Sequence, residues 1–502
     1  MERRKKKEAT VTHPRCFWMI LPVILATSLP AAPTDVRLVE AVKNSDKAAI
    51  QKLLPQHIDL SAADTDGSTA LHWAVRRDDL ETVNLLIRSG ADVKTANRYG
   101  VTPLSLACLN GSAAVIESLL RAGADANSAL PGGETALMTA ARTGKVGAVK
   151  ALIAHGADVN FKESQRGQTA LMWAAADGNT AVVEELIEHG ADRRAATKGG
   201  FTPLLFAVRE GRIDTVRALL KSGADVNETW KAGRGAGVAG ISAMVLAVAN
   251  AHYELAGVLL DAGADPNAAA QGWTALHQIT WVRKPGKGDN DPAPEGSGNL
   301  SSLDLVRKLV AHGANVNARM TKSGNVGRTS LNMVGATPFL MAARTADAPL
   351  MRLLTELGAD PSLGNADNTT PLLAAAGVGT YSPGEDPGTE PEVLEAVKLA
   401  LELGGDLNGV DNKGETVIHA TAYKQVPSVT QFLIDKGAKI AIWNQKNKTG
   451  WTPLRMADGV MFGGAAIRSS EAVAVILRQV MSAAGVSTIV EPDIERIGHP
   501  VK

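Results

Sequence analysis

Three groups of residues have the types that binding or catalytic chemistry needs: a glycine run, the histidines and the cysteines. The run from Gly235 to Gly240 has the Gly-x-Gly-x-x-Gly spacing of loops that bind dinucleotide phosphates. That chemistry requires a buried strand before the loop, within a β-α-β unit. No parallel-strand pattern is present here, so we predict a flexible hairpin. Small-molecule or nucleotide binding through Gly235–Gly240 is kept as the less favoured alternative.

The histidines invite a metal-site hypothesis, but their placement is periodic. Equivalent residues of stacked helices lie roughly 10 Å apart, whereas zinc ligands sit about 2 Å from one ion. We therefore predict structural roles and no metal site. Three histidines share the fourth place of a repeated motif, namely His72, His277 and His419; three others precede a turn glycine, namely His155, His189 and His312.

The cysteines and the remaining motifs give no catalytic set. Cys16 lies in an N-terminal apolar run, and Cys108 alone cannot form an internal disulfide. Cys108 is predicted to be a small buried residue. The chain has no Gly-x-Ser-x-Gly elbow and no phosphate-binding Gly-x-x-x-x-Gly-Lys-Ser/Thr loop. We predict no catalytic residues, no cofactor and no enzyme activity.

The first 32 residues have the pattern of an export signal. Six basic residues against two acidic ones give a net charge of +4, and an apolar run, 16–29, follows. This run is short for a membrane span but typical of a signal-peptide core. We expect export to a periplasm or secretion, with no stable membrane span after signal removal. Anchoring by an uncleaved signal is the alternative.

The elements that must position any site are set by an internal repeat. Gly-Ala-Asp begins at Gly90, Gly123, Gly156, Gly190 and Gly223, so successive copies are 33, 33, 34 and 33 residues apart. Self-similarity at this period is typical of stacked helical pairs. Further copies or close variants begin at Gly263, Gly313, Gly358, Gly404 and Gly437.

One repeat shows the local pattern. Thr102 is a good helix N-cap and Pro103 suits the first helical position. Gly111 ends the predicted first helix, and Gly123 ends an antiparallel second helix. The opening recurs eleven times, at Thr69, Thr102, Thr135, Thr169, Thr202, Ser242, Thr274, Thr337, Thr370, Thr416 and Thr452.

This chain resembles the ankyrin repeat family in three features. They are the motif Thr-(Pro/Ala)-Leu-His-x-Ala, the helix-ending Gly-Ala-Asp-x-Asn and the 33-residue period. The resemblance implies an all-α ankyrin-type α-solenoid of about 11 helix-turn-helix repeats with projecting hairpin loops and degenerate terminal caps. We predict a signal peptide at 1–32, an N-terminal capping repeat at 33–62, the solenoid at 63–485 and a C-terminal tail at 486–502.

The later repeats depart from the regular period. Gaps between turn glycines lengthen to 40, 50, 45 and 46 residues between Gly223 and Gly404, then return to 33. The insertions are predicted near 228–240, 284–299, 318–335 and 377–391. Because insertions in solenoids map to surface loops, often at the binding face, we keep both partner selectivity and tolerated drift as interpretations.

The placement of aromatic and arginine residues gives the candidate binding surface. Aromatic residues make up only 4% of the chain, yet several fall in projecting loops or on first helices. Trp, Tyr and Arg dominate binding hot spots. Packing at repeat junctions is the alternative role for the aromatics. The predicted partner-binding residues are Trp73, Arg98, Tyr99, Arg142, Arg166, Trp173, Phe201, Arg209, Trp273 and Trp451.

These features together predict a non-catalytic scaffold that binds one or more proteins in an exported compartment. With the first 32 residues at +4 and a total of zero, the rest of the chain sums to −4. A nucleic-acid groove would need a basic stripe, so we predict no nucleic-acid partner. An accessory or protector role for an exported enzyme is the main alternative. The oligomeric state and the partner's identity are left open.

Overall fold

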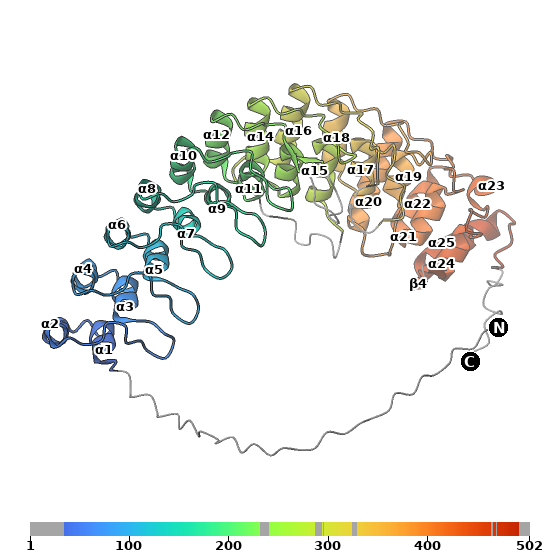
Figure 1. The fold of residues 1–502 in the computed structure, drawn as a ribbon. Coiled ribbons are helices and arrows are strands. Elements are labelled where there is room, and N and C mark those ends of the chain that lie inside the picture. Colours follow the sequence, from blue (N-terminus) through green and yellow to red (C-terminus); the bar gives the residue numbers. More distant parts are fainter. Residues whose placement is uncertain are drawn as a thin grey trace, which may run out of the picture.

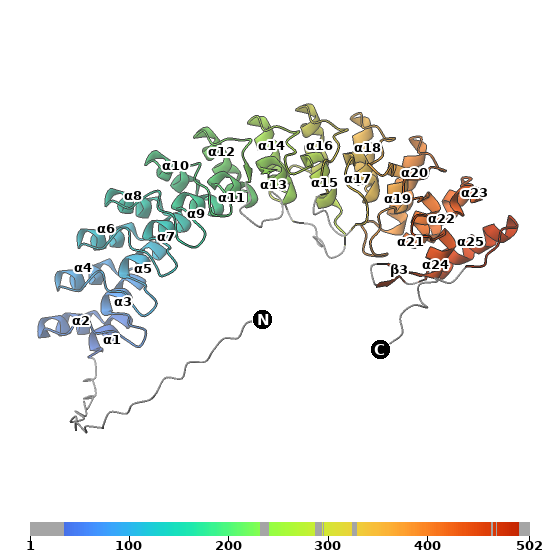
Figure 2. The same cartoon turned by 45° about the vertical axis from the view of Figure 1, so that its right-hand side comes forward.

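The protein folds into an arch of paired helices, seen from two directions in Figures 1 and 2. The computed structural model describes residues 35–230, 240–286, 294, 296–323, 329–462, 465–467 and 469–490. In each pair, one helix lies on the inner side of the arch and its partner lies on the outer side. We call them the inner and outer helices.

The inner helices are the first members of the pairs. They are α1 (Arg37–Lys43), α3 (Ala70–Arg76), α5 (Pro103–Asn110), α7 (Ala136–Thr143), α9 (Ala170–Asp177), α11 (Pro203–Arg209), α13 (Ala243–Ala249), α15 (Ala275–Arg283), α17 (Pro338–Arg344), α19 (Pro371–Ala376), α21 (Val417–Lys424) and α24 (Pro453–Asp458).

The outer helices are the second members. They are α2 (Lys47–Leu53), α4 (Leu80–Arg88), α6 (Ala113–Arg121), α8 (Val146–Ala154), α10 (Thr180–Glu188), α12 (Ile213–Lys221), α14 (Tyr253–Asp261), α16 (Ser302–Ala311), α18 (Ala348–Glu356), α20 (Glu390–Glu402), α22 (Pro427–Asp435) and α25 (Glu471–Ala483).

The α5–α6 pair forms for the reasons that its sequence predicts. The Thr102 hydroxyl accepts a hydrogen bond from the Ser105 backbone N–H at 3.2 Å, and Pro103 takes the first turn. Gly111 ends α5 with a φ of 71°, a left-handed conformation that favours glycine. On α6, Val115 and Leu119 are fully buried and form part of its apolar stripe. The predicted N-cap and helix end of this repeat are confirmed.

One continuous hydrophobic core runs through the stack. It extends from Leu38 on α1 to Met481 on α25. Alanines on the inner helices, such as Ala107 and Ala174, are fully buried and let neighbouring pairs approach closely. Cys108 belongs to this core, as predicted, and burial raises the pKa of its thiol to about 12.

The motif histidines tie each repeat to the next, as predicted. His72 Nδ1 lies 2.9 Å from the Thr69 hydroxyl, and its Nε2 lies 3.0 Å from the Val101 carbonyl oxygen in the following hairpin. His277 and His419 make the same pair of contacts in their own repeats. Burial lowers the pKa of each of these two imidazoles to about 4. They are therefore neutral braces of the stack.

The structure also contains elements that the repeat pattern does not predict. A short 3-10 helix, η1 (Leu54–Gln56), follows α2, and α23 (Ile440–Trp443) lies in the hairpin after α22. The strands β1 (Thr229–Trp230) and β2 (Ile241–Ser242) pair antiparallel, as do β3 (Val460–Phe462) and β4 (Ala465–Ile467). The β1–β2 pair and α23 lie in projecting hairpins, whereas the β3–β4 pair lies between α24 and α25.

Several predictions fall outside the described residues. They include the signal peptide at 1–32, residues 235–239 of the glycine run and residues 491–502 of the tail. In the described part of the chain, no helix has the length and apolar character to cross a membrane.

Candidate functional site

Two positions on every inner helix face the inner side of the arch. They are the fourth and the seventh residues after the capping Thr or Ser. Residues three apart lie on the same helix face, and the opposite face of each inner helix packs against its outer helix. The side chains at these two positions therefore line the concave side. We call them the groove positions.

On α3 to α11, eight of the ten groove positions are at least partly exposed, and the other two, Thr139 and Phe206, are buried. Trp73 and Trp173 are half-buried, Leu109 is 55% exposed, and Arg142 and Arg209 are exposed. The set at least partly exposed on α3, α5, α7, α9 and α11 is Trp73, Arg76, Leu106, Leu109, Arg142, Trp173, Ala176 and Arg209. We call this set the N-terminal face.

Trp73 is held between two cations at one end of the N-terminal face. Lys43 Nζ lies 4.7 Å from the ring centroid and the Arg76 guanidinium carbon lies 5.1 Å from it. The indole Nε1–H donates to Asp64 Oδ2 at 2.8 Å, and Lys43 pairs with the same oxygen at 2.9 Å. Although burial alone would raise the pKa of the Asp64 carboxyl, its hydrogen bonds with Asp66, Lys43 and Trp73 hold it well below its usual range.

Arg142 and Trp173 pair across two successive repeats. The guanidinium carbon of Arg142 on α7 lies 5.0 Å from the ring centroid of Trp173 on α9. Arg142 also contacts Glu134 at 3.4 Å. The buried indole Nε1 of Trp173 has no hydrogen-bond partner among the described residues. Two residues that the sequence predicts separately thus form one cation–π pair.

Phe201 and Arg209 form a third group, at α11. The Arg209 guanidinium carbon lies 5.3 Å from the ring centroid of Phe201 and 5.1 Å from that of Phe206. Phe201 makes edge contacts with Phe206 and with Trp230 of strand β1. The half-buried Phe201 therefore joins the projecting hairpin to the N-terminal face.

The predicted loop residues Arg98, Tyr99 and Arg166 lie apart from these groups. All three are exposed at hairpin tips, and Tyr99 is 69% exposed. The backbone N–H of Arg98 donates to the Asp66 carbonyl of the previous hairpin at 2.9 Å. Their side chains are presented to solvent on the edge that the hairpins form.

Trp273 does not fit the prediction that it contacts a partner. Its side chain is only 5% exposed, and its ring packs edge-on against Trp281 with centroids 5.6 Å apart. The indole N–H is used within the repeat, donating to Gln278 Oε1 at 2.9 Å. Trp273 is a core residue because the following hairpin packs over its turn, where the Thr321 backbone N–H donates to the Gly272 carbonyl at 2.9 Å.

The groove positions of the later inner helices are buried. Met341 is 0%, Arg344 7%, Ala374 1%, Ala420 2% and Tyr423 9% exposed. These residues occupy the same helix register as Trp73 and Arg142. The difference in exposed fraction must therefore come from other segments of the protein that cover these positions.

Two segments within the predicted insertions meet over these helices. The backbone N–H of Ser330 donates to the Gly379 carbonyl at 3.0 Å, and the Thr329 hydroxyl donates to the same oxygen at 2.8 Å. A Cβ added to Gly379, whose φ is +95°, would lie 2.5 Å from the Leu331 Cβ. This close approach needs glycine, and it closes the groove over α17 and α19.

The predicted residue Trp451 lies at the edge of this covered part. It is half-buried at the start of α24, and its backbone N–H donates to Asn447 Oδ1 at 2.9 Å. Together with Glu415 and Tyr423 it lines a cavity of about 270 Å³.

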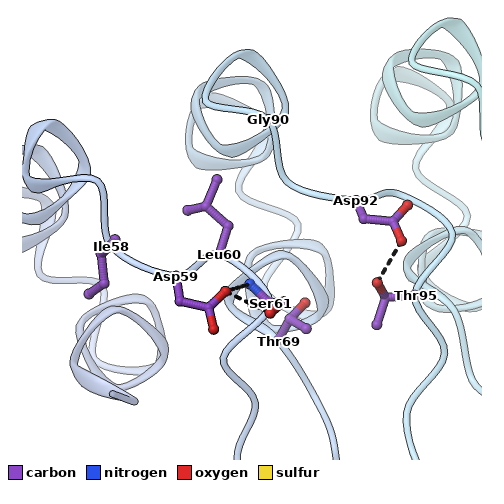
Figure 3. A pocket seen from close by; sticks show the side chains of 8 residues that line it. All are labelled: Ile58, Asp59, Leu60, Ser61, Thr69, Gly90, Asp92 and Thr95. Atoms are coloured by element: carbon purple, nitrogen blue, oxygen red, sulfur yellow. Dashed lines mark hydrogen bonds between the residues drawn. The ribbon is translucent and has the colours of Figure 1, made fainter. Parts of the chain in front are cut away.

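A hollow of about 330 Å³ lies near the other end of the arch, between the turns at Leu60 and Asp92 (Figure 3). Its carboxylates are engaged within their own turns. Asp59 Oδ1 accepts from the Ser61 hydroxyl at 2.6 Å, and Asp92 Oδ2 accepts from the Thr95 hydroxyl at 2.9 Å. It has the turn geometry of the repeat, so we do not assign it a site.

The sequence analysis missed several members of the N-terminal face. Arg76, Leu106 and Leu109 were not among the predicted residues, because the prediction used aromatic residues and loop arginines. Counting four and seven residues from each capping Thr would have found all three. Phe206, Trp230 and Lys43 were also missed, and they contribute the rings and cation that complete the groups above.

The fold and the N-terminal face define a helical-repeat scaffold, and comparison with known proteins agrees. The family model for ankyrin repeats in three copies matches residues 38–130, 98–163, 114–192 and 137–229. Residues 38–229 of the chain are ankyrin repeats. Ankyrin repeats generally mediate protein–protein interaction.

Two individual proteins illustrate the likeness. The chain is 32% identical over 136 residues to the B-cell lymphoma 3 protein homolog of Mus musculus, covering 27% of this chain and 24% of that protein. It thus spans about a quarter of the length of this relative. The solved ankyrin repeat domain of human ASB11 is 25% identical, with a TM-score of 0.39, covering 45% of this chain and 96% of that domain.

Proposed function

We propose that this protein is a non-catalytic scaffold that binds a protein partner through its N-terminal face. The observation that carries the proposal is the run of Trp, Leu and Arg side chains at the groove positions of successive inner helices. Monomeric proteins rarely leave such side chains aligned without use. Trp and Arg are also the residue types whose truncation most weakens protein complexes.

The mechanism that we propose is rigid presentation. Each ring of the N-terminal face is already fixed by contacts within the protein, as Trp73 is by Lys43, Arg76 and Asp64. A surface with ordered side chains loses little conformational entropy on docking. The exposed hairpin residues Arg98, Tyr99 and Arg166 offer a second set of contacts on the edge of the arch.

Copurification from the native source tests this function. A tagged full-length chain is compared with the double variant Trp173→Ala plus Arg209→Ala. We expect one stoichiometric partner with the parent chain and its loss with the variant. The matched control is Arg217→Ala, because Arg217 lies on the outer helix of the same repeat as Arg209. The Arg217 side chain is 56% exposed and the Arg209 side chain is 42% exposed. Equal loss with the control would argue against the N-terminal face.

We further propose that the protein works in an exported compartment, periplasmic or secreted. The support is the basic stretch and apolar run within residues 1–32, which has the order of a signal peptide. Intact-mass measurement of the protein from its native source tests this proposal. A mass lacking about the first 32 residues is expected, and a mass that includes them would argue against processing.

Two alternatives make different predictions in the same experiments. If the protein protects an exported enzyme, the copurified partner will be an enzyme whose stability depends on this chain. If the Gly235–Gly240 run binds a nucleotide, nucleotides will raise the melting temperature and Gly237→Ala will remove the effect. Residues 235–239 lie outside the described residues, so the run carries no structural argument.

A further inference from the structure

A cavity lies on the concave side of the later repeats, where the inserted segments meet the hairpin tips. Its volume is about 270 Å³. Its apolar walls include Leu331, Tyr423, Met456 and Trp451, and its polar lining includes Thr380 and Glu415. Drug-sized ligand pockets usually run from about 300 to 1,000 Å³. This cavity is therefore of a size for one long side chain.

Glu415 brings a carboxylate that lacks a cation. Its Oε1 accepts a hydrogen bond from Asn447 Nδ2 at 2.6 Å. Within the described residues, no lysine, arginine or histidine nitrogen lies within ion-pair distance of this carboxylate. Burial, together with the charge of Asp411, raises the pKa of Glu415 to about 7. The carboxylate is thus poorly compensated in the free protein.

The nearest lysine is already engaged elsewhere. Lys413 Nζ pairs with Asp367 at 3.0 Å, and its side chain is 46% exposed at the rim. Asp411 is buried and accepts a hydrogen bond from the Thr369 hydroxyl at 2.9 Å. Three carboxylates, those of Asp367, Asp411 and Glu415, therefore face two lysines, Lys413 and Lys448, of which Lys448 acts on Asp367.

A second polar group in the wall also lacks a partner. Thr380 is only 4% exposed, and its buried hydroxyl makes no hydrogen bond within the part of the chain that the structure describes. Buried hydroxyl groups are normally satisfied. A polar group that enters the cavity can therefore form a hydrogen bond with the Thr380 hydroxyl.

We propose that this cavity receives an arginine or lysine side chain of the protein partner. The partner as its source rests on the proposed function. The aliphatic part of such a side chain fits the apolar walls, and its cationic end meets Glu415. Trp451 and Tyr423 line the same cavity and lengthen its apolar wall. An apolar side chain would fill the space but would leave Glu415 and Thr380 unsatisfied.

The test uses the full-length protein and two capped amino acids of matched shape. Isothermal titration calorimetry measures binding of N-acetyl-arginine amide and of N-acetyl-citrulline amide, its neutral counterpart. We expect the arginine amide to bind at least about ten-fold more tightly, because only it supplies a charge to Glu415. Glu415→Gln should remove this preference while the protein keeps its circular dichroism spectrum and urea midpoint.

Glu134→Gln is the matched control. Glu134 precedes the capping Thr135 as Glu415 precedes Thr416, but it faces Arg142 in the regular part of the stack. This control should keep the arginine preference. Three results would each overturn the proposal. They are equal binding of the two amides, an unchanged preference in Glu415→Gln, and no binding by the folded protein up to about 10 mM.

The pH dependence gives a second readout. The charged and titratable groups that face Glu415 are Asp411, Lys413 and Tyr423. Of these, Tyr423 stays neutral, because burial raises its pKa to about 12. Ionisation of Glu415 should therefore strengthen arginine-amide binding as the pH rises from about 6 to 8. A preference that does not change over this range would contradict the assignment.

The two proposals can fail separately. Trp173→Ala plus Arg209→Ala should abolish partner capture but leave binding of the arginine amide unchanged. Glu415→Gln should remove the arginine preference and weaken partner capture without abolishing it. Loss of amide binding in the variant with Trp173 and Arg209 replaced would overturn the assignment of the amide to this cavity.

Discussion

The arch contains two regions that share one repeat but present different surfaces. In the regular region, α3 to α12 (residues 70–221), the groove positions hold partly exposed residues such as Trp173 and Arg209. In the inserted region, α17 to α24 (residues 338–458), the same register holds buried Met341 and Arg344. The inner helices follow the same capping pattern in both regions, so the difference lies in the connections.

This contrast shows how insertions change the function of a repeat without changing its frame. The segments around Ser330 and Gly379 bond to each other and cover the groove. Long loops add little to the entropic cost of folding, so the frame tolerates them. Covering the groove removes a broad exposed surface and leaves a small cavity beside Glu415 and Trp451.

The largest expected effect compares two helix N-caps. Asp347 caps α18, is 0% exposed, and pairs with Arg283 at 2.7 Å. Asp347→Ala would leave Arg283 without its partner and should lower the free energy of unfolding by about 3–5 kcal/mol. Asp79 caps α4 in the regular region, and Asp79→Ala should lower it by only about 1 kcal/mol. Urea denaturation of both variants measures the difference.

Equal losses at Asp347 and Asp79 would break the comparison. Equal losses would mean that the buried pair of Asp347 with Arg283 contributes no more to the free energy of unfolding than the N-cap Asp79 does.

Acid should weaken the stack through its neutral histidine braces. The pKa of His277 and of His419 is about 4 in the folded chain against 6.5 for the free side chain, because of burial. Between these values the unfolded chain binds more protons, so stability falls as the pH drops through 6.5 towards 4. Each histidine should contribute about 2 kcal/mol of this loss between pH 7 and pH 4.5.

The measurement is the urea midpoint as a function of pH for the parent chain and for His419→Gln. Between pH 7 and pH 4.5 the variant should lose about 2 kcal/mol less stability than the parent chain loses. Glu228 and Glu415 act in the opposite direction, since their pKa values are raised to about 7 by burial and the folded chain binds the extra protons. His72→Gln is the comparison from the regular region, where burial also lowers the pKa of the histidine. An unchanged slope in His419→Gln would count against the neutral brace.

Partner affinity should depend on the regular region. Removing the half-buried ring in Trp173→Ala deletes a cation–π pair and a central anchor. We expect a loss of about 2 kcal/mol in binding free energy, roughly thirty-fold in Kd. Biolayer interferometry with the copurified partner measures it. Lys150→Ala on outer helix α8, whose side chain is 61% exposed, should bind like the parent chain.

The smallest expected effect concerns Tyr99. Because its side chain is 69% exposed, Tyr99→Ala should change the free energy of unfolding by less than about 0.5 kcal/mol. Phe339→Ala on α17 removes a ring that is 0% exposed and should lower it by about 3–5 kcal/mol. Thermal or urea unfolding checks both. A large effect at Tyr99 would show that the hairpin edge is structural.

Most of the fold could be predicted because its signals are local. The capping of α5 by Thr102 and its end at Gly111 depend on a few neighbouring residues. The bracing role of His72 follows from its place in a motif that recurs in phase. The small helix α23 and the strands β3 and β4 were missed, because the segments that form them do not follow the repeat pattern.

The candidate surface was harder to predict, because the burial of its side chains depends on residues that are distant in the sequence. Trp273 and Phe201 occupy the same place before a capping Thr, yet Trp273 is buried and Phe201 is half-buried. Local sequence does not distinguish them, since the contacts come from the following hairpin: Trp230 packs against Phe201, and Thr321 bonds to Gly272 beside Trp273. The pairing of Arg142 with Trp173 likewise depends on how two repeats stack.

Hydrogen exchange on the full-length chain, with and without its copurified partner, tests the central claim most directly. If the N-terminal face binds the partner, new protection should concentrate in inner helices α3, α7, α9 and α11. The covered inner helices α17 and α19 should change little. Protection confined to α17 and α19, with none on α3 to α11, would contradict the account.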